Sequence, residues 1–172
     1  MKNLYIAGKI NKHDFRRQNP ILNNILDKFC DGAELAKLGD ILSRGHCSLS
    51  NSVNYMGPFP SQMSHASSTY THGLHGSRMY GDSDRNGTRE RVQDICQEGI
   101  KRCDVFFAFF EKDSGSAYGT VAEIGYAKAL GKKLIIAGEY NDDLWFAYKM
   151  ADFVIPTIDF VKALAIVLQD MD

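Results

Sequence analysis

The sequence predicts an α/β fold with a mostly parallel sheet. Short apolar runs that are typical of strands, such as residues 104–110 (DVFFAFF), alternate with longer stretches whose apolar residues recur at helical spacing. After Asp104, this run is apolar at consecutive positions, as expected for a strand covered on both faces. Strands that alternate with helices in this way form a parallel sheet with crossover helices.

Five strands are expected, at residues 3–10, 50–59, 104–110, 132–138 and 152–156. Helices are expected from Pro20 to about Gly32, and at residues 87–103, 120–131, 141–151 and 157–171, with one further short segment within 36–45. For the last helix, the spacing predicts a buried face formed by Ile158, Val161, Leu164, Ala165 and Leu168.

Length and composition predict a single domain over residues 1–172 that does not bind a nucleic-acid polymer. The chain has 172 residues, is 44% hydrophobic and 24% charged, and carries a formal net charge of −1. A protein that coats DNA or RNA normally needs a basic surface. No apolar run approaches the roughly 20 residues that cross a bilayer. Without a secretory signal or a CxxC pair, a cytoplasmic protein with reduced thiols is expected.

A long loop at residues 56–88 differs in composition from the rest of the chain. It is rich in Ser, Gly, His, Tyr and Met, and a loop of this length in a compact domain is usually functional or disordered. We expect an active-site loop, since ligands of such folds bind beyond the carboxyl ends of the strands. His72 and His75 form an HxxH pair without a third spaced ligand, so they are expected to face substrate and no metal is expected.

Glu123 is an acidic residue among small and apolar ones. On the predicted helix, Gly119, Glu123 and Ala127 share one face, and Gly125 and Ala127 are expected to let the helix pack tightly on the sheet. The carboxylate lies near the positive end of the helix dipole and near the open end of the sheet. Two interpretations follow: a nucleophile, or a glutamate that only stabilises the helix dipole.

Several motifs occur together in a specific order. They are YIAGKI, YMGPF, CDVFFAFF, AYGTVAEIGYAKALGKKLI and ADFVI, and the Gly119-to-Ala127 core is the most specific. In these segments the chain resembles the nucleoside 2-deoxyribosyltransferase family, including its phage and prokaryotic members and the related nucleotide N-glycosidases. The resemblance covers the N-terminal strand and most of residues 104–155. It implies a flavodoxin-like (Rossmann-like) three-layer sandwich and cleavage of an N-glycosidic bond.

The resemblance also implies roles for individual residues. Glu123 corresponds to the nucleophile that attacks C1′ of the sugar, and Tyr5 to the tyrosine that holds it. Many members carry an aspartate where this chain has Ala117, and another where it has Cys96. The proton donor to the leaving base is therefore left open among Asp94, Asp113 and a histidine of the long loop. Residues expected to contact the substrate are Gly8, Lys9, Arg16, Gly57, Phe59, His72, His75, Ser116, Tyr118 and Gly119.

The expected activity is glycosyl transfer or hydrolysis on a nucleoside or nucleoside 5′-monophosphate, without a cofactor, in nucleotide metabolism or salvage. One alternative is a nucleotide sensor that has lost the chemistry, and another is a glycohydrolase that cleaves NAD on the same fold. Trp145 and Phe146 are expected to pack the late helix or to reach a neighbouring subunit. Because family members are commonly oligomeric, a homodimer or higher homo-oligomer is expected.

Overall fold

The chain forms an α/β structure around one parallel sheet. The computed structural model describes residues 1–10, 14–28, 37–61, 71–72, 88–112 and 117–172. Five strands lie in the order β2-β1-β5-β6-β7, and the four pairings between them are parallel. Numbered along the chain, this is the order 2-1-3-4-5 of flavodoxin-like folds. The predicted fold class is confirmed. The strands are β1 (Lys2–Ala7), β2 (Val53–Tyr55), β5 (Val105–Phe110), β6 (Lys133–Gly138) and β7 (Phe153–Ile155).

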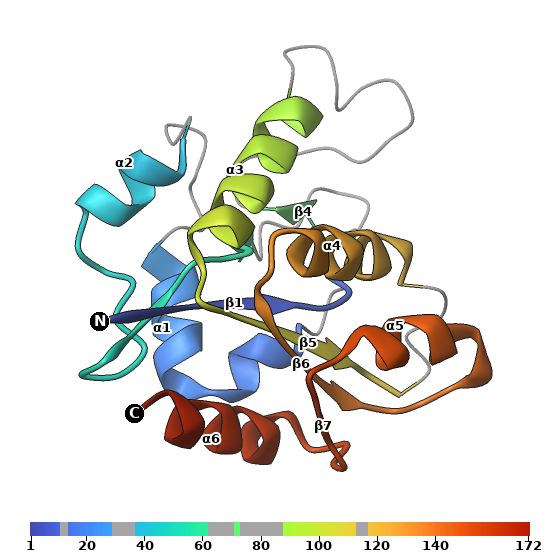
Figure 1. Ribbon diagram of the computed structural model, residues 1–172. Helices are drawn as coiled ribbons and strands as arrows, with labels where there is room; N and C mark the ends of the chain where they lie inside the picture. The colour runs from blue at the N-terminus through green and yellow to red at the C-terminus, as the bar shows by residue number, and fades with distance from the viewer. Residues whose placement is uncertain (11–13, 29–36, 62–70, 73–87, 113–116) are drawn as a thin grey trace.

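Helices cover both faces of the sheet (Figure 1). One face carries α3 (Thr88–Arg102), α4 (Tyr118–Ala129) and α5 (Trp145–Met150), and the other carries α1 (Pro20–Lys28) and α6 (Phe160–Met171). The described residues also form the short helix α2 (Leu38–Ser43) and two 3₁₀ turns, η1 (Phe15–Gln18) and η3 (Asp142–Leu144). None of the helices in the described part of the chain is long and apolar enough to cross a membrane.

The alternation of side chains along the strands divides the core into two layers. In β1, Leu4 and Ile6 pack with α1 and α6, whereas Tyr5 and Ala7 pack on the side of α3, α4 and α5. All six residues of β5 are buried, as the apolar run at 104–110 predicts. Each inner strand therefore supplies both hydrophobic layers of the three-layer sandwich.

The buried face of α6 differs from the sequence prediction. Ile158, Val161 and Ala165 are exposed rather than inward. The residues that α6 buries are Phe160, Ala163, Leu164, Val167 and Met171. Asp159 caps the helix by accepting a hydrogen bond from the Lys162 amide, and the Phe160 ring packs on those of Phe15 and Phe109. The Asp159 cap and the Phe160 contacts determine which face of α6 is buried. The buried positions lie about one residue before those that the apolar spacing predicted.

The strand order reverses between β1 and β5, so the topological switch point lies at their carboxyl ends. The chain runs from β1 to β2 on one side, and later returns to form β5 on the other side of β1. Connections that leave adjacent strands in opposite directions mark the usual ligand position of such folds. The segment predicted as a long active-site loop contributes β3 (Pro60–Ser61) and β4 (Thr71–His72), which pair antiparallel. The rest of that segment lies outside the described residues, apart from its two ends.

Candidate active site

Tyr5 and Glu123 meet at this edge of the sheet. The Tyr5 hydroxyl donates a hydrogen bond of 2.6 Å to Oε1 of Glu123. Tyr5 lies in β1, and Glu123 lies in the second turn of α4. Helix α4 follows Ala117, whose φ of 40° is in the left-handed region that alanine rarely adopts. The two residues that the sequence singled out most strongly thus lie in direct contact.

The Tyr5 ring is held on three sides. It stacks on Phe106 of β5 with ring centroids 5.4 Å apart. A Cβ atom at Gly57 would lie 3.3 Å from the ring, and one at Gly99 would lie 3.1 Å from it and 2.4 Å from the Met56 carbonyl oxygen. The glycine in the middle of α3 therefore lets this helix approach the ring closely, which offsets its low helix propensity.

Cys96 is the second polar contact of the tyrosine. Its thiol, on α3, lies near the Tyr5 hydroxyl and helps to raise the pKa of that hydroxyl. Burial, together with the nearby Glu123 charge, raises the pKa of the Cys96 thiol to about 12, so the thiol stays protonated at neutral pH. Burial also raises the pKa of Tyr5 well above its ordinary value. The tyrosine is thus a neutral donor between a thiol and a carboxylate.

The environment of Glu123 brings its titration close to neutral pH. Burial raises the pKa of this partly buried carboxyl from 4.5 to about 7, and the Tyr5 hydrogen bond and the Arg16 charge counteract part of the increase. Near pH 7 both protonation states are therefore populated. A carboxyl group tuned in this way acts as a nucleophile when ionised and as an acid when protonated.

Arg16 lies inside the protein, whereas the sequence placed it among the residues that contact the substrate. Its side chain is fully buried. Nε donates to the Ile6 carbonyl at 3.0 Å, Nη2 to the Gly8 carbonyl at 2.8 Å, and Nη1 to both oxygens of Asp14 at 2.9 Å. Each guanidinium nitrogen thus has an internal partner, which removes Arg16 from the residues that reach a ligand directly.

Three of the predicted substrate contacts have structural roles of their own. A Cβ at Gly8 would lie 2.5 Å from the Phe15 ring, so the packing of η1 against β1 requires glycine there. Phe59 is buried, and its ring packs edge-on against Tyr55 at 5.2 Å. Gly57, with φ of 120°, lies next to the Tyr5 ring. A role of these residues in binding stays a prediction.

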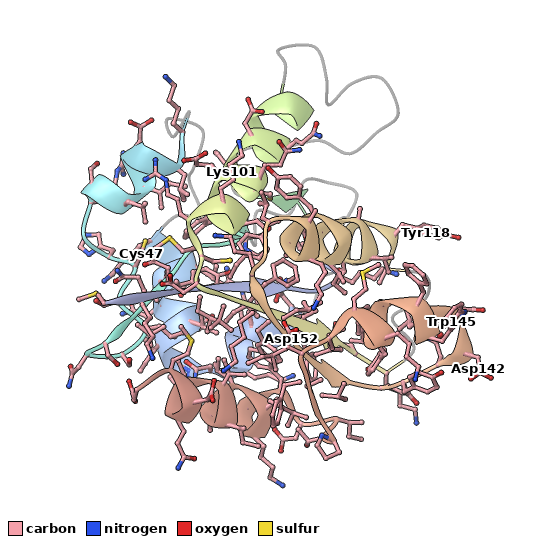
Figure 2. All side chains as sticks on the ribbon, viewed as in Figure 1. Cys47, Lys101, Tyr118, Asp142, Trp145 and Asp152 are labelled. Carbon is pink, nitrogen blue, oxygen red and sulfur yellow. The ribbon has the colours of Figure 1, made fainter. Side chains whose placement is uncertain are left out.

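Other predicted contacts lie at the open rim of the site. Nothing lies within 4 Å of a Cβ built on Gly119, which leaves open space at the start of α4. Tyr118 is 81% exposed, and its side chain projects away from the body of the molecule (Figure 2). Lys9 is also exposed, just beyond the end of β1. These positions can meet a ligand without displacing the core.

Asp94 does not share the side of α3 that faces Tyr5. Asp94 is exposed on α3, two residues before Cys96, and a helix turns through about 200° over two residues. His72 belongs to β4, whereas Asp113, Ser116 and His75 lie outside the described residues. No group of three His, Cys, Asp or Glu side chains in the described segments could hold a metal ion.

Sequence reasoning missed Asp14 and Gly99 as parts of this site. Asp14 is buried with Arg16, but a single aspartate in a short loop gave no signal of that burial. Gly99 did give one, because a glycine in the middle of an otherwise regular helix often marks a close approach by another part of the chain.

Comparisons of the chain with protein-family models, curated proteins and solved structures find no match. The contact between Tyr5 and Glu123 is therefore the structural basis for assigning a function. The expected class of reaction comes from the motif resemblance in the sequence.

Proposed function

We propose that this protein cleaves the N-glycosidic bond of a nucleoside or nucleoside 5′-monophosphate, with Glu123 as the nucleophile. The observation that supports the proposal best is the hydrogen bond from Tyr5 to Oε1 of Glu123 at the carboxyl edge of the sheet. A buried tyrosine that fixes one carboxylate oxygen leaves the other oxygen to attack a substrate. A glutamate that only stabilised the helix dipole would not need this partner.

The proposed reaction has two steps. In the first, the ionised Glu123 carboxylate forms an ester bond to C1′ while the bond from C1′ to the base nitrogen breaks, and the base departs with that electron pair. The departing base takes up a proton, for which Asp113 and the histidines of the long loop remain the sequence candidates. In the second step, another base or water attacks C1′ and releases the carboxylate, which restores the free enzyme.

The transition state explains why a carboxylate suits this position. Positive charge develops on the sugar as the base leaves, and a carboxylate beneath the ring stabilises it. Tyr5 holds Glu123 by a neutral hydrogen bond, so the negative charge remains available to the sugar. The exposed Tyr118 ring and the open space above Gly119 lie on the same helix, where the base or sugar can enter.

The deciding experiment incubates the protein with nucleosides, deoxynucleosides and their 5′-monophosphates, with and without a free second base. Chromatography then measures free base and exchanged nucleoside. Base release or exchange is expected in the wild type and is expected to be lost in Glu123→Gln. Glu98→Gln is the matched control, since Glu98 is on the surface of α3 and pairs with Arg102. Undiminished base release by Glu123→Gln would refute the proposal.

One observation favours a second candidate function, a nucleotide sensor. Cys96 stands where many members of the resembled family carry an aspartate, and its thiol remains protonated at neutral pH. A site that lost its acid would bind the ligand without turning it over. Calorimetric binding of a monophosphate without base release distinguishes the sensor. Adding NAD to the same panel tests the glycohydrolase alternative, because nicotinamide would appear.

A further inference from the structure

Near the proposed site, the edge of β1 that faces β2 has no neighbouring strand among the described residues, because β2 ends earlier. Strand β2 pairs with β1 as far as Leu4 and Tyr55, and the last backbone contact beyond that pairing joins the Ile6 amide to the Gly57 carbonyl. The carbonyls of Ile6 and Gly8 would then face no strand. The guanidinium of Arg16 occupies this place, with Nε on the first carbonyl and Nη2 on the second. One buried side chain therefore takes over the hydrogen bonds of the absent strand.

Asp14 fixes the orientation of that guanidinium. Both of its oxygens accept from Nη1, and Oδ1 also accepts from the backbone amide of Arg16. Both side chains are fully buried. Phe15, between them in the sequence, packs against Phe109 and Phe160. The three consecutive residues thus attach the carboxyl end of β1 to the hydrophobic core.

The same guanidinium influences Glu123. Besides burial, two groups shift the pKa of this carboxyl, the Tyr5 hydroxyl from β1 and the Arg16 guanidinium from η1. The Cys96 thiol from α3 lies nearby, and its own pKa is raised by the Glu123 charge. The tyrosine and the thiol are neutral, so Arg16 supplies the positive charge among them. Its charge lowers the pKa of Glu123 against the effect of burial, and it also lowers the pKa of the Cys96 thiol.

We propose that Asp14 and Arg16 form a positioning unit for the chemistry at Glu123. In this unit Asp14 aligns the guanidinium, the guanidinium holds the end of β1 that carries Tyr5, and its positive charge favours the ionised nucleophile. The inference rests on the proposed function for the reaction itself, but its electrostatic part is measurable without turnover. Arg16 acts through Glu123 and β1 and does not touch the substrate.

The test measures the pKa of Glu123 in the full chain by carbon-13 NMR of glutamate carboxyl groups, with Glu123→Gln to assign the signal. The wild type is expected to titrate at about 7. Arg16→Gln removes the positive charge and is expected to raise that pKa by about half a unit or more. Asp14→Asn breaks the same ion pair but leaves the guanidinium charged, so the pKa is expected to stay constant or to fall.

Arg16→Lys separates charge from geometry. It keeps the positive charge, but an ammonium group does not reproduce the planar contacts with two carbonyls and a carboxylate. The Glu123 titration is expected to remain near that of the wild type, while base release at saturating substrate falls about tenfold or more. Base release equal to the wild type in Arg16→Lys would overturn the geometric part of the proposal.

The outcomes separate this inference from a purely structural ion pair and from the proposed function. If Asp14 and Arg16 form a purely structural ion pair, the pKa of Glu123 should shift equally in Arg16→Gln and Asp14→Asn. An increased Glu123 pKa in both variants, or an unchanged Glu123 pKa in Arg16→Gln, would overturn the proposal of a positioning unit. Thermal unfolding checks each variant, and if Arg16→Gln does not fold, an increase in Asp14→Asn or Arg16→Lys is the contradicting result. A wild type that releases no base refutes the proposed function alone, because the titration still decides the electrostatic role.

Discussion

The hydroxyl of Tyr5 lies 2.6 Å from Oε1 of Glu123, although 118 residues separate them in the sequence. The contact joins a residue of the inner strand β1 to a residue of helix α4, near the point where the strand order reverses. Because burial raises the pKa of Glu123 to about 7, the same contact also affects how the protein responds to pH.

Replacing Glu123 by glutamine is expected to stabilise the protein while abolishing base release. The folded-state pKa of about 7 exceeds the ordinary value of 4.5, so the folded protein binds this proton more strongly than the unfolded chain does. The stabilising contribution of the Glu123 carboxyl is therefore fully present below about pH 4.5, and it is lost as the pH rises through about 7. At pH 8, Glu123→Gln should gain about 3 kcal/mol in free energy of unfolding, and little at pH 4.5.

Urea denaturation at both pH values measures this difference. A Glu123→Gln variant that is less stable than the wild type at pH 8 would contradict the prediction. Glu98→Gln again serves as the control, since its exposed ion pair with Arg102 should change stability little at either pH.

Replacing Tyr5 by phenylalanine is expected to move the pH dependence of activity. The nucleophile must be ionised, so base release should rise with pH through about 7 in the wild type. Tyr5→Phe removes a hydrogen bond that favours the ionised carboxylate, so the rise should occur at higher pH and activity at pH 7 should fall about tenfold or more. A pH–rate profile measures both effects.

Tyr148→Phe is the matched control for Tyr5→Phe. The Tyr148 hydroxyl is buried without a hydrogen-bond partner among the described residues, and its ring stacks on Phe110. Its loss should leave the pH profile unchanged. Equal shifts in the two variants would show that the effect is not specific to the contact with Glu123.

Replacing Gly99 by alanine is expected to reduce both stability and activity. The new Cβ would lie 2.4 Å from the Met56 carbonyl oxygen, so α3 or the Tyr5 ring must shift, at a cost of about 1–3 kcal/mol. Gly125→Ala is the control, because nothing lies within 4 Å of its Cβ and α4 should gain about 0.5–1 kcal/mol. Thermal unfolding measures the stability of the two variants, and chromatography measures their base release. A Gly99→Ala variant as stable as the wild type would contradict the prediction.

Self-association is expected through the aromatic residues at the start of α5. Trp145 is 55% exposed and Phe146 57% exposed, and Figure 2 shows the Trp145 side chain at the same edge of the molecule as Tyr118. Exposed aromatic residues are enriched at protein interfaces. Sedimentation velocity should show at least a dimer, and Trp145→Asp should shift it toward the monomer. A monomer at the highest concentration tested would contradict this prediction.

The strands were predictable because their signals are local, and the contact between Tyr5 and Glu123 was implied by the motif resemblance. The apolar run of β5 is buried throughout, and the motif around Glu123 lies on one helix. Apolar spacing was less informative for α6, where the buried face depends on contacts of Phe160 with distant rings. For Gly125, tight packing on the sheet was expected, but open space surrounds its Cβ position, whereas Ala127 is buried.

The role of Arg16 was not predictable in the same way. An arginine near the end of a strand ordinarily suggests a surface charge or an anion contact. Its actual partners are two carbonyls of β1 and the carboxylate of Asp14. Which carbonyls lack a strand partner depends on where β2 leaves the sheet, and this is a property of tertiary structure.

The parallel pairing of β1 with β5 has a consequence for the order of events during folding. Leu4 to Ala7 pair with Val105 to Ala108, so about a hundred residues must be enclosed before Tyr5 has its stacking partner. Such long-range closure is slow compared with the formation of α4, which already carries Glu123. In the newly formed helix the Glu123 carboxylate is therefore exposed to water and has the ordinary pKa of a glutamate. That acidity changes only when the last long-range contacts form, so the Glu123 titration also marks the arrival of the native state.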